Sequence, residues 1–307
     1  MKELLQNFLK CSEESHSNII YVQMYQGNEL KAEYQRFPMK TRLNVWSVAK
    51  PFVSMGTGIA LKERLISLDE LIYTAFEEYF PIHPSEYLYQ ITVRDLLTMS
   101  SGIEEPLFFC DGEERYRIKD WIRYFFHQGH FCHSPGTHFC YSNFNCYILS
   151  AMIEQRAGAN LLNYLRYRLF EPLGIGNPDW TLCPMGHCMA ANGLYLTIDE
   201  LSRFGQMLLN LGEYDGRQIV PKEYVQAARS TQIRTDANDE CSVESDGYGY
   251  FIRISPVPNS IMMLGNYGQA CHVDYSNQTV VSVMSLDGDN HQKIQSDLVY
   301  AIRDYYG

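Results

Sequence analysis

Alternating hydrophobic and polar residues at opposite ends of the chain predict β-strands. Residues 19–25 and 30–37 flank a turn-forming Gln-Gly-Asn-Glu sequence, which is typical of a β-hairpin. Near the other end, residues 248–254, 260–275 and 279–286 are rich in β-branched and aromatic side chains and are separated by Pro, Asn, Ser and Gly. We therefore expect strands at both ends of the chain.

A helical spacing of apolar residues marks both termini and most of the middle of the chain. The terminal helices are predicted from Leu4, Leu5, Phe8 and Leu9 and from Ile294, Leu298, Val299 and Ile302. In between, Thr92 and Thr197 precede helix starts, each with an acidic residue three positions on. A further helical pattern follows Asn145 and ends at Gly158. The middle of the chain is therefore predicted to be mainly helical.

The order of these elements predicts the fold class. Strands from distant ends of a chain usually share one antiparallel sheet, which places the helical section beside it. We expect an α/β (α+β) protein with an antiparallel sheet flanked by the N- and C-terminal helices. Residues 1–60 and 240–307 would form the sheet domain and residues 61–239 a mostly helical domain, with the active-site cleft between them.

Composition and charge argue against several classes of protein. The formal net charge is −11, and no run of Lys and Arg could offset the phosphates of a nucleic acid. No stretch approaches the roughly 18 consecutive apolar residues of a membrane span. Polar and charged residues interrupt the apolar N-terminal run, unlike an export signal, and the nine cysteines show no regular spacing. We expect a cytoplasmic protein that has no membrane span and binds no nucleic acid.

A candidate nucleophile lies at residues 44–51, Asn-Val-Trp-Ser-Val-Ala-Lys-Pro, where a helix is predicted to begin. Ser47 precedes Lys50 by three positions, so the two side chains would share one helix face. The helix start would also offer the backbone N–H of Ser47 to an oxyanion. A lysine accepts a proton only when neutral, a form that burial or a nearby cation favours. The alternative is that Ser47 caps the helix and Lys50 is solvated.

A second candidate group lies just before another predicted helix. Tyr141-Ser142-Asn143 follows the turn sequence Ser-Pro-Gly-Thr at 134–137. Tyr141 could transfer a proton and Asn143 could bind a substrate amide. Tyrosine is a base near neutrality only if cations such as Lys50 stabilise its phenolate. The alternative is a tyrosine that anchors the core beside a capping asparagine.

His and Cys residues are concentrated between residues 127 and 140. They are His127, His130, Cys132, His133, His138 and Cys140. Their spacings match neither Cys-x-x-Cys nor His-Glu-x-x-His, and Gly129 and Pro135 would interrupt a helix that aligned them. The same holds for Cys183 and Cys188 around His187. We therefore expect no metal ion and no other cofactor.

The order of these motifs resembles the penicillin-recognising serine hydrolases: class C β-lactamases, DD-peptidases and their esterase relatives. The similarity extends to residues 91–103, 134–143, 169–175 and 191–220. It implies a sheet with terminal helices beside a helical domain. It also implies that Ser47 is the acylated nucleophile, Lys50 its proton partner, Tyr141 the general base and acid, and Asn143 a substrate-orienting amide.

The third motif of the family departs from its usual form. Relatives carry Lys-Thr-Gly, His-Thr-Gly or His-Gly-Gly on a strand beside the serine, and by position this chain has Asn266-Tyr267-Gly268. Gln269 then falls where the family places its second oxyanion N–H. Asn266 brings no positive charge and Tyr267 brings a large ring. His272 would restore a charge only if a continuous strand put it on the same face.

The resemblance and this departure together predict an enzyme class. We expect a serine hydrolase that cleaves an ester or amide of a small molecule through an acyl-serine intermediate. The missing cation favours a neutral substrate, and the absence of an export signal favours an intracellular or imported one. The alternatives are a β-lactamase or D-alanyl-D-alanine carboxypeptidase, and a non-catalytic binding or sensor protein.

Overall fold

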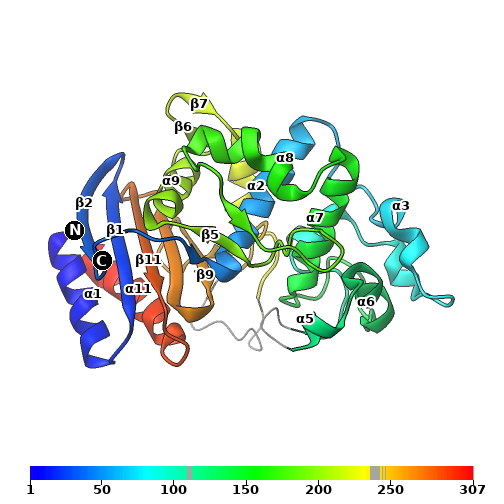
Figure 1. Cartoon of the computed structure of the whole chain (residues 1–307), viewed down its shortest axis with the longest axis horizontal. Helices are drawn as coiled ribbons and strands as arrows, with labels where there is room; N and C mark the ends of the chain where they lie inside the picture. Colours follow the sequence, from blue (N-terminus) through cyan, green and yellow to red (C-terminus); the bar gives the residue numbers. More distant parts are fainter. Residues whose placement is uncertain (109–112, 236–242, 244, 246, 307) are drawn as a thin grey trace.

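A six-stranded antiparallel sheet joins strands from both ends of the chain (Figure 1). The computed structural model describes residues 1–108, 113–235, 243, 245 and 247–306. The strand order is β2-β1-β11-β10-β9-β8. The strands are β1 (Ile19–Gln26), β2 (Glu29–Gln35), β8 (Arg253–Ile254), β9 (Ser260–Gly265), β10 (Gln269–Asp274) and β11 (Thr279–Ser285). The predicted mixed fold with an antiparallel sheet is confirmed, and the N-terminal hairpin pairs with the last strand.

The two faces of this sheet pack against different helices. On β11, Val281 and Val283 belong to a core with the terminal helices α1 (Lys2–Glu14) and α11 (His291–Tyr306). The alternate residues Val280 and Met284 belong to the larger core of the other face. Because successive strand side chains point to opposite faces, β11 is buried on both sides. Figure 1 shows the terminal helices side by side on the outer face.

Helix α9 (Ile198–Leu209) covers the other face of the sheet. The predicted capping box is present, because the Glu200 amide donates to the Thr197 hydroxyl while the Glu200 carboxylate accepts from the Thr197 amide. A Cβ atom at Gly205 would lie 2.6 Å from Val280 Cγ1 and 2.9 Å from Cys271 Sγ. The glycine therefore allows the helix to approach the sheet closely.

The remaining elements are mostly helical, as the pattern predicted. The α-helices are α2 (Ala49–Lys62), α3 (Tyr73–Phe76), α4 (Val93–Leu97), α5 (Glu114–Arg117), α6 (Trp121–Gln128), α7 (Asn143–Ala157), α8 (Leu161–Leu165) and α10 (Lys222–Ala228). Short helical turns are η1 (Trp46–Val48), η2 (Glu77–Tyr79), η3 (Glu86–Tyr89), η4 (Arg166–Phe170), η5 (Glu171–Leu173) and η6 (Asn266–Gly268). None of the helices in the described ranges is long and apolar enough to cross a membrane.

Several boundaries differ from the sequence expectations. Helix α7 starts at Asn143, earlier than predicted, because the Ser142 hydroxyl caps it by accepting from the Phe144 amide. Of the predicted strand 248–254, only β8 joins the sheet, since Tyr248 bridges Ile233 instead. The run 260–275 is divided by η6. The predicted domain boundary at residue 240 lies outside the described residues.

Five short strands were not predicted. They form the sheet β3 (Leu43–Asn44), β5 (Leu194–Leu196) and β4 (Asp179–Trp180) and the hairpin β6 (Glu213–Tyr214) with β7 (Arg217–Gln218). Strands of two or three residues are too short to produce a periodic pattern. Pairing of β3 with β5 fixes the chain just before η1.

Candidate active site

Ser47 and Lys50 lie at the junction of η1 and α2 and face each other. Lys50 Nζ donates a hydrogen bond to Ser47 Oγ at 2.8 Å and another to the Ala191 carbonyl at 3.3 Å. The Lys50 side chain is buried, with 1% exposure, whereas Ser47 is partly exposed. The hydroxyl of a partly exposed serine is thus in direct contact with a buried amine, as the Ser-x-x-Lys spacing predicted.

The backbone before Ser47 is held in an unusual conformation. Trp46 has φ 50°, in the left-handed region that bulky residues rarely adopt. Asn44 Oδ1 accepts hydrogen bonds from the amides of Trp46, at 2.9 Å, and of Gly193, at 3.1 Å. This carboxamide therefore ties the strained turn to the neighbouring segment. Strain of this kind is concentrated at functional sites, where the surrounding contacts maintain it.

Tyr141 reaches Lys50 from a loop that is fixed by backbone hydrogen bonds. The Cys140 amide donates to the Met99 carbonyl at 2.8 Å, and the Gly136 amide donates to the Ser100 carbonyl at 2.8 Å. Lys50 Nζ lies 4.7 Å from the centroid of the Tyr141 ring. The loop thus brings the phenol of the second motif to the Ser47–Lys50 pair.

Asn143 is the first residue of α7, two positions beyond Tyr141, and is half-buried. Ser142 between them is fully buried and serves as the helix N-cap. The alternative of a capping asparagine is therefore wrong for this tripeptide, since the cap is the serine. Asn143 therefore lies at the same loop-to-helix junction as Tyr141.

The end of β9 passes directly beside the Ser47 backbone. A Cβ atom at Gly265 would lie 2.6 Å from the Val45 carbonyl oxygen and 3.2 Å from the Ser47 nitrogen. A residue with a side chain would therefore push the strand away from the candidate nucleophile. Nothing in the sequence distinguished this glycine from others in β-rich segments, because the approach depends on tertiary packing.

The third motif lies at this point but forms a turn. Asn266–Gly268 are the 3₁₀ turn η6, where a strand was expected, and Tyr267 has φ 59°. Asn266 is exposed, and the Tyr267 ring stacks on Trp46 with centroids 4.8 Å apart. An aromatic pair thus lies beside Ser47, formed by its chain neighbour and the middle residue of the turn.

Gln269 and His272 lie beyond this turn, on β10. Gln269 pairs with Gly265 across the two strands, and its side-chain amide donates to the Ser285 carbonyl at 2.5 Å. His272 is 1% exposed, its Nε2 lies 2.9 Å from Ser255 Oγ, and burial lowers its pKa to about 4. Because the turn interrupts the strand between Asn266 and His272, the two residues do not share one strand face. His272 is therefore neutral near pH 7 and does not restore the missing charge.

A cation reaches the site from a position that the sequence reasoning missed. Arg253, the first residue of β8, places its guanidinium carbon 5.0 Å from the centroid of the Tyr141 ring. Lys50 approaches the same ring from α2. No local motif marks Arg253, because the contact joins two distant segments of the chain.

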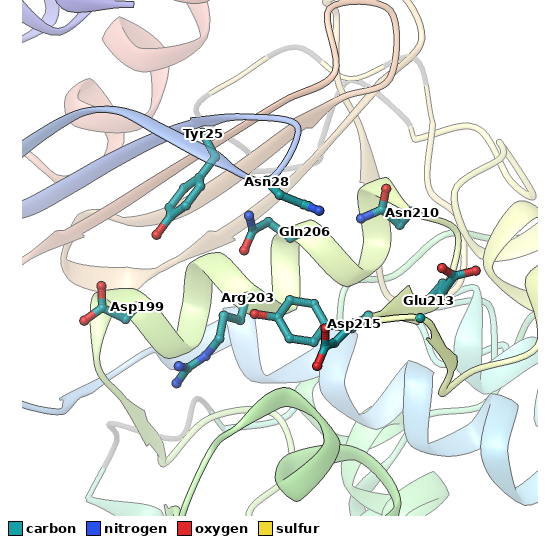
Figure 2. A pocket seen from close by; sticks show the side chains of 10 residues that line it. Tyr25, Asn28, Asp199, Arg203, Gln206, Asn210, Glu213 and Asp215 are labelled. Carbon is teal, nitrogen blue, oxygen red and sulfur yellow. The ribbon is translucent and has the colours of Figure 1, made fainter.

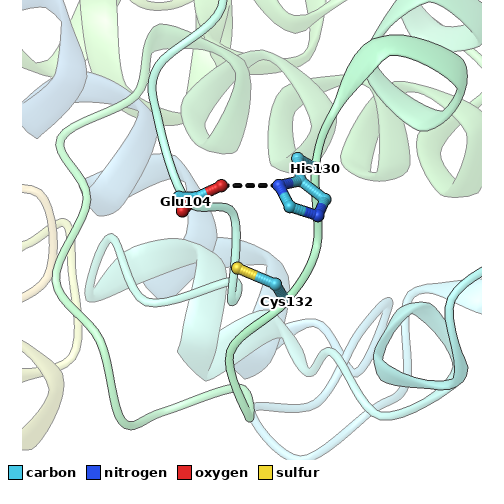
Figure 3. Close-up of side chains that lie close together, drawn as sticks. All are labelled: Glu104, His130 and Cys132. Carbon is cyan, nitrogen blue, oxygen red and sulfur yellow. Dashed lines mark hydrogen bonds and ion pairs between the residues drawn. The ribbon is translucent and has the colours of Figure 1, made fainter.

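Part of the His/Cys-rich segment gains a carboxylate from a neighbouring loop (Figure 3). Ligand atoms of Glu104, His130 and Cys132 lie within 4.8 Å of one another, and Glu104 bonds the His130 ring at 2.5 Å. Glu104 and His130 are exposed. These residue types are possible metal ligands, and the histidine–carboxylate hydrogen bond also satisfies both groups by itself.

A polar cavity of about 770 Å³ lies over α9 (Figure 2), and Ser47 is not among its lining residues. Its lining includes Asp199, Arg203 and Gln206 from α9, Asn210 just after this helix, Tyr25 from β1, and Glu213 and Asp215 from the β6–β7 hairpin. None of the predicted site residues lines it. The cavity therefore adds nothing to the Ser47 site.

Comparisons with known proteins identify the family of the chain. A sequence model of the family described as Beta-lactamase matches residues 20–302. An uncharacterized protein of Alkalihalophilus pseudofirmus is 23% identical over 265 residues, which cover 80% of this chain and 71% of that protein. EstCE1, a hydrolase with promiscuous acyltransferase activity, has a similar structure, with a TM-score of 0.79 at 15% identity and coverage of 98% of this chain and 99% of that one. The penicillin binding protein from Bacillus halodurans gives a TM-score of 0.74 at 16% identity, with 97% and 99% covered. The protein therefore belongs to the beta-lactamase family of serine hydrolases.

Proposed function

We propose that this hydrolase cleaves an ester or amide of a small molecule through an acyl-Ser47 intermediate. The observation that carries the proposal is the 2.8 Å contact between Ser47 Oγ and the buried Lys50 amine, which also lies 4.7 Å from the Tyr141 ring centroid. A nucleophile in contact with a proton acceptor, itself beside a second acid–base group, is the arrangement that acyl transfer requires.

The reaction would proceed in two steps. Ser47 Oγ attacks the substrate carbonyl while its proton passes to the Lys50–Tyr141 pair, and an ester bond to Ser47 forms as the carbonyl–leaving-group bond breaks. Tyr141 returns the proton to the departing alcohol or amine. Water then attacks the acyl-Ser47 ester and releases the acid. The backbone N–H groups of Ser47 and of Gln269, which follows the turn between β9 and β10, would hold the oxyanion.

The substrate-binding role would fall to residues around this centre. Asn143 would orient the substrate through its amide. Asn266, Tyr267 and Gly268 would form the wall on the other side of Ser47. Because Asn266 is uncharged and the Tyr267 ring lies against Trp46, a compact neutral ester or amide is favoured over a bulky β-lactam.

A substrate panel with matched serine variants tests the proposal. It would contain p-nitrophenyl esters of increasing chain length, D-amino-acid amides and nitrocefin. We expect Ser47→Ala to lose at least about 10³-fold in kcat/KM. Ser54→Ala removes a buried hydroxyl from α2, the helix that follows Ser47, where it bonds Tyr224, and should retain activity. Unchanged hydrolysis in Ser47→Ala would refute the mechanism.

The same panel separates the alternatives. Fast nitrocefin turnover by the wild-type protein would identify a β-lactamase and contradict the argument from Asn266 and Tyr267. Covalent labelling of Ser47 by a fluorophosphonate, with no turnover of any compound, would indicate a binding or sensor protein. We expect turnover of short-chain esters and slow or no hydrolysis of nitrocefin.

A further inference from the structure

The Tyr141 ring lies between two cations from different parts of the chain. Lys50 Nζ is 4.7 Å from the ring centroid, and the Arg253 guanidinium carbon is 5.0 Å from it. Tyr248 packs edge-on against the same ring. Lys50, from α2, and Arg253, from β8, both carry a positive charge.

The position of Arg253 is set by its surroundings. It pairs with Met262 of β9, the strand that passes beside Ser47 at Gly265. Its guanidinium also lies 5.6 Å from the ring centroid of Tyr248, which is buried and packs edge-on against Tyr141. The arginine is thus held against two aromatic rings, an arrangement that favours a cation at this place.

Neither Asn266 nor His272 supplies the cation that the third motif lacks. Asn266 is uncharged, and His272 is buried against Ser255 on a strand beyond the turn. A tyrosine accepts a proton only as its negatively charged phenolate, and positive charge nearby is needed to populate the phenolate near neutral pH. Arg253 supplies positive charge at the ring itself, from a strand that the family motifs do not include.

We propose that Arg253 is a positioning residue that, together with Lys50, stabilises the phenolate form of Tyr141, the form that accepts the Ser47 proton. The inference rests on the proposed function and adds to it a residue outside the three motifs. Arg253 acts through Tyr141 and does not contact the substrate. It therefore affects the rate of acylation and its dependence on pH, and leaves the binding of neutral substrates unchanged.

The test measures kcat, KM and the pH dependence of kcat/KM with an uncharged p-nitrophenyl ester. Arg253→Gln should lower kcat about tenfold with KM unchanged within about twofold, and should move the rising limb of the pH profile upward by about one unit. The upward direction follows because loss of a cation disfavours the negative form of the acceptor. Arg253→Lys, which keeps the charge, should recover most of kcat and the wild-type profile.

Matched variants control for packing. Arg229 lies 3.9 Å from the Tyr275 ring centroid, in the same kind of contact away from Ser47, and Arg229→Gln should leave the kinetics unchanged. Arg253→Met keeps an aliphatic side chain against the two rings. If the Gln variant does not fold, the Met variant is compared with the wild type instead. Circular dichroism establishes which variants are folded.

Each outcome decides the matter. Equal pH profiles for wild type and the folded Gln or Met variant would overturn the proposal, as would failure of Arg253→Lys to recover activity. A rise in KM confined to carboxylate-bearing esters would also overturn it, since it would indicate a substrate contact. Labelling of Ser47 by a fluorophosphonate keeps the two claims separate. If Ser47 is labelled and activity depends on it, but the Arg253 variants have wild-type kinetics, only this inference is refuted.

Discussion

At the scale of single residues, two aromatic side chains with left-handed backbone lie beside Ser47, the proposed nucleophile. Trp46 precedes Ser47 with φ 50°, and Tyr267 stacks on it with φ 59°. Left-handed backbone costs roughly 1–2 kcal/mol for residues with a Cβ atom. The stacked rings and the Asn44 hydrogen bond to the Trp46 amide offset part of this cost. The site therefore retains a conformation that its residue types do not prefer.

This strain leads to a prediction for Tyr267. Both Tyr267→Ala and Tyr267→Gly remove the stacked ring, but only glycine adopts positive φ without penalty. We expect Tyr267→Gly to be more stable than Tyr267→Ala by about 1 kcal/mol. Urea unfolding of the two variants measures the difference. Equal stabilities would show that the turn relaxes and that residue 267 carries no strain.

The residue scale also shows how far sequence reasoning reaches at the site. Ser47 and Lys50 could be paired in advance, because three positions at a helix start fix their relative placement. Tyr141 could be assigned to the site only through its resemblance to a family motif. Arg253 and Gly265 were missed because their positions beside the site depend on which distant segments pack together, and no spacing along the chain encodes that.

At the scale of elements, the turn η6 is where the structure departs from the strand that the sequence predicted. The apolar run 260–275 has the composition of a strand throughout, yet positive φ at Tyr267 and Gly268 turns the chain between β9 and β10. His272 consequently lies on the partner strand and bonds Ser255. The β-propensity of the run was correct for two strands, and the turn residues carried no Asn-Gly or Asp-Gly signal.

The contact of α9 with the sheet gives a prediction at this scale. Helix propensity alone would make Gly205→Ala stabilising by roughly 1 kcal/mol. The new Cβ would meet Val280 and Cys271 inside 3 Å, however, and overpacking of this kind costs about 1–3 kcal/mol. We expect a net destabilisation, measured by thermal or urea unfolding. Gly176→Ala adds a methyl group where no atom lies within 4 Å and should change stability by less than about 0.5 kcal/mol.

A stabilised Gly205→Ala protein would contradict this account. It would mean that α9 can shift away from β10 and β11 at little cost. The same variant should then also move the capped start of the helix at Thr197, which is fixed by its hydrogen bonds with Glu200.

At the scale of the whole molecule, the site is assembled from all three stretches of the chain. Ser47 and Lys50 come from the N-terminal part, Tyr141 from the helical middle and Arg253 from the C-terminal strands. The pairing of terminal strands could be predicted because both ends were β-rich and the middle was not. The short strands that place η1 were too brief to produce a pattern.

The buried His272 makes the stability of the whole fold depend on pH. Burial lowers its pKa to about 4, below the value of about 6.5 for an unfolded chain. The unfolded state therefore binds more protons between these values, and the folded state loses up to about 3 kcal/mol as the pH falls from 6.5 to 4. His272→Gln should remove this part of the pH dependence.

Urea unfolding of both proteins at several pH values between 7 and 4 provides the measurement. The difference in unfolding free energy between wild type and His272→Gln should shrink or change sign as the pH falls. His83→Gln, which alters an exposed histidine, should track the wild type throughout. Parallel curves for wild type and His272→Gln would show that the pKa of His272 is the same in the folded and unfolded states, and would contradict this account.

The central claim, an acyl intermediate on Ser47 formed with the help of Lys50, is tested most directly by intact-mass and peptide analysis after rapid mixing with a p-nitrophenyl ester. The account predicts a transient acyl adduct on the peptide containing Ser47, absent in Ser47→Ala. In Lys50→Met the adduct should form at least about 10²-fold more slowly, whereas Lys62→Met, at the exposed end of the same helix, should form it at the wild-type rate. An adduct on another residue, or product release by Ser47→Ala at the wild-type rate, would contradict it.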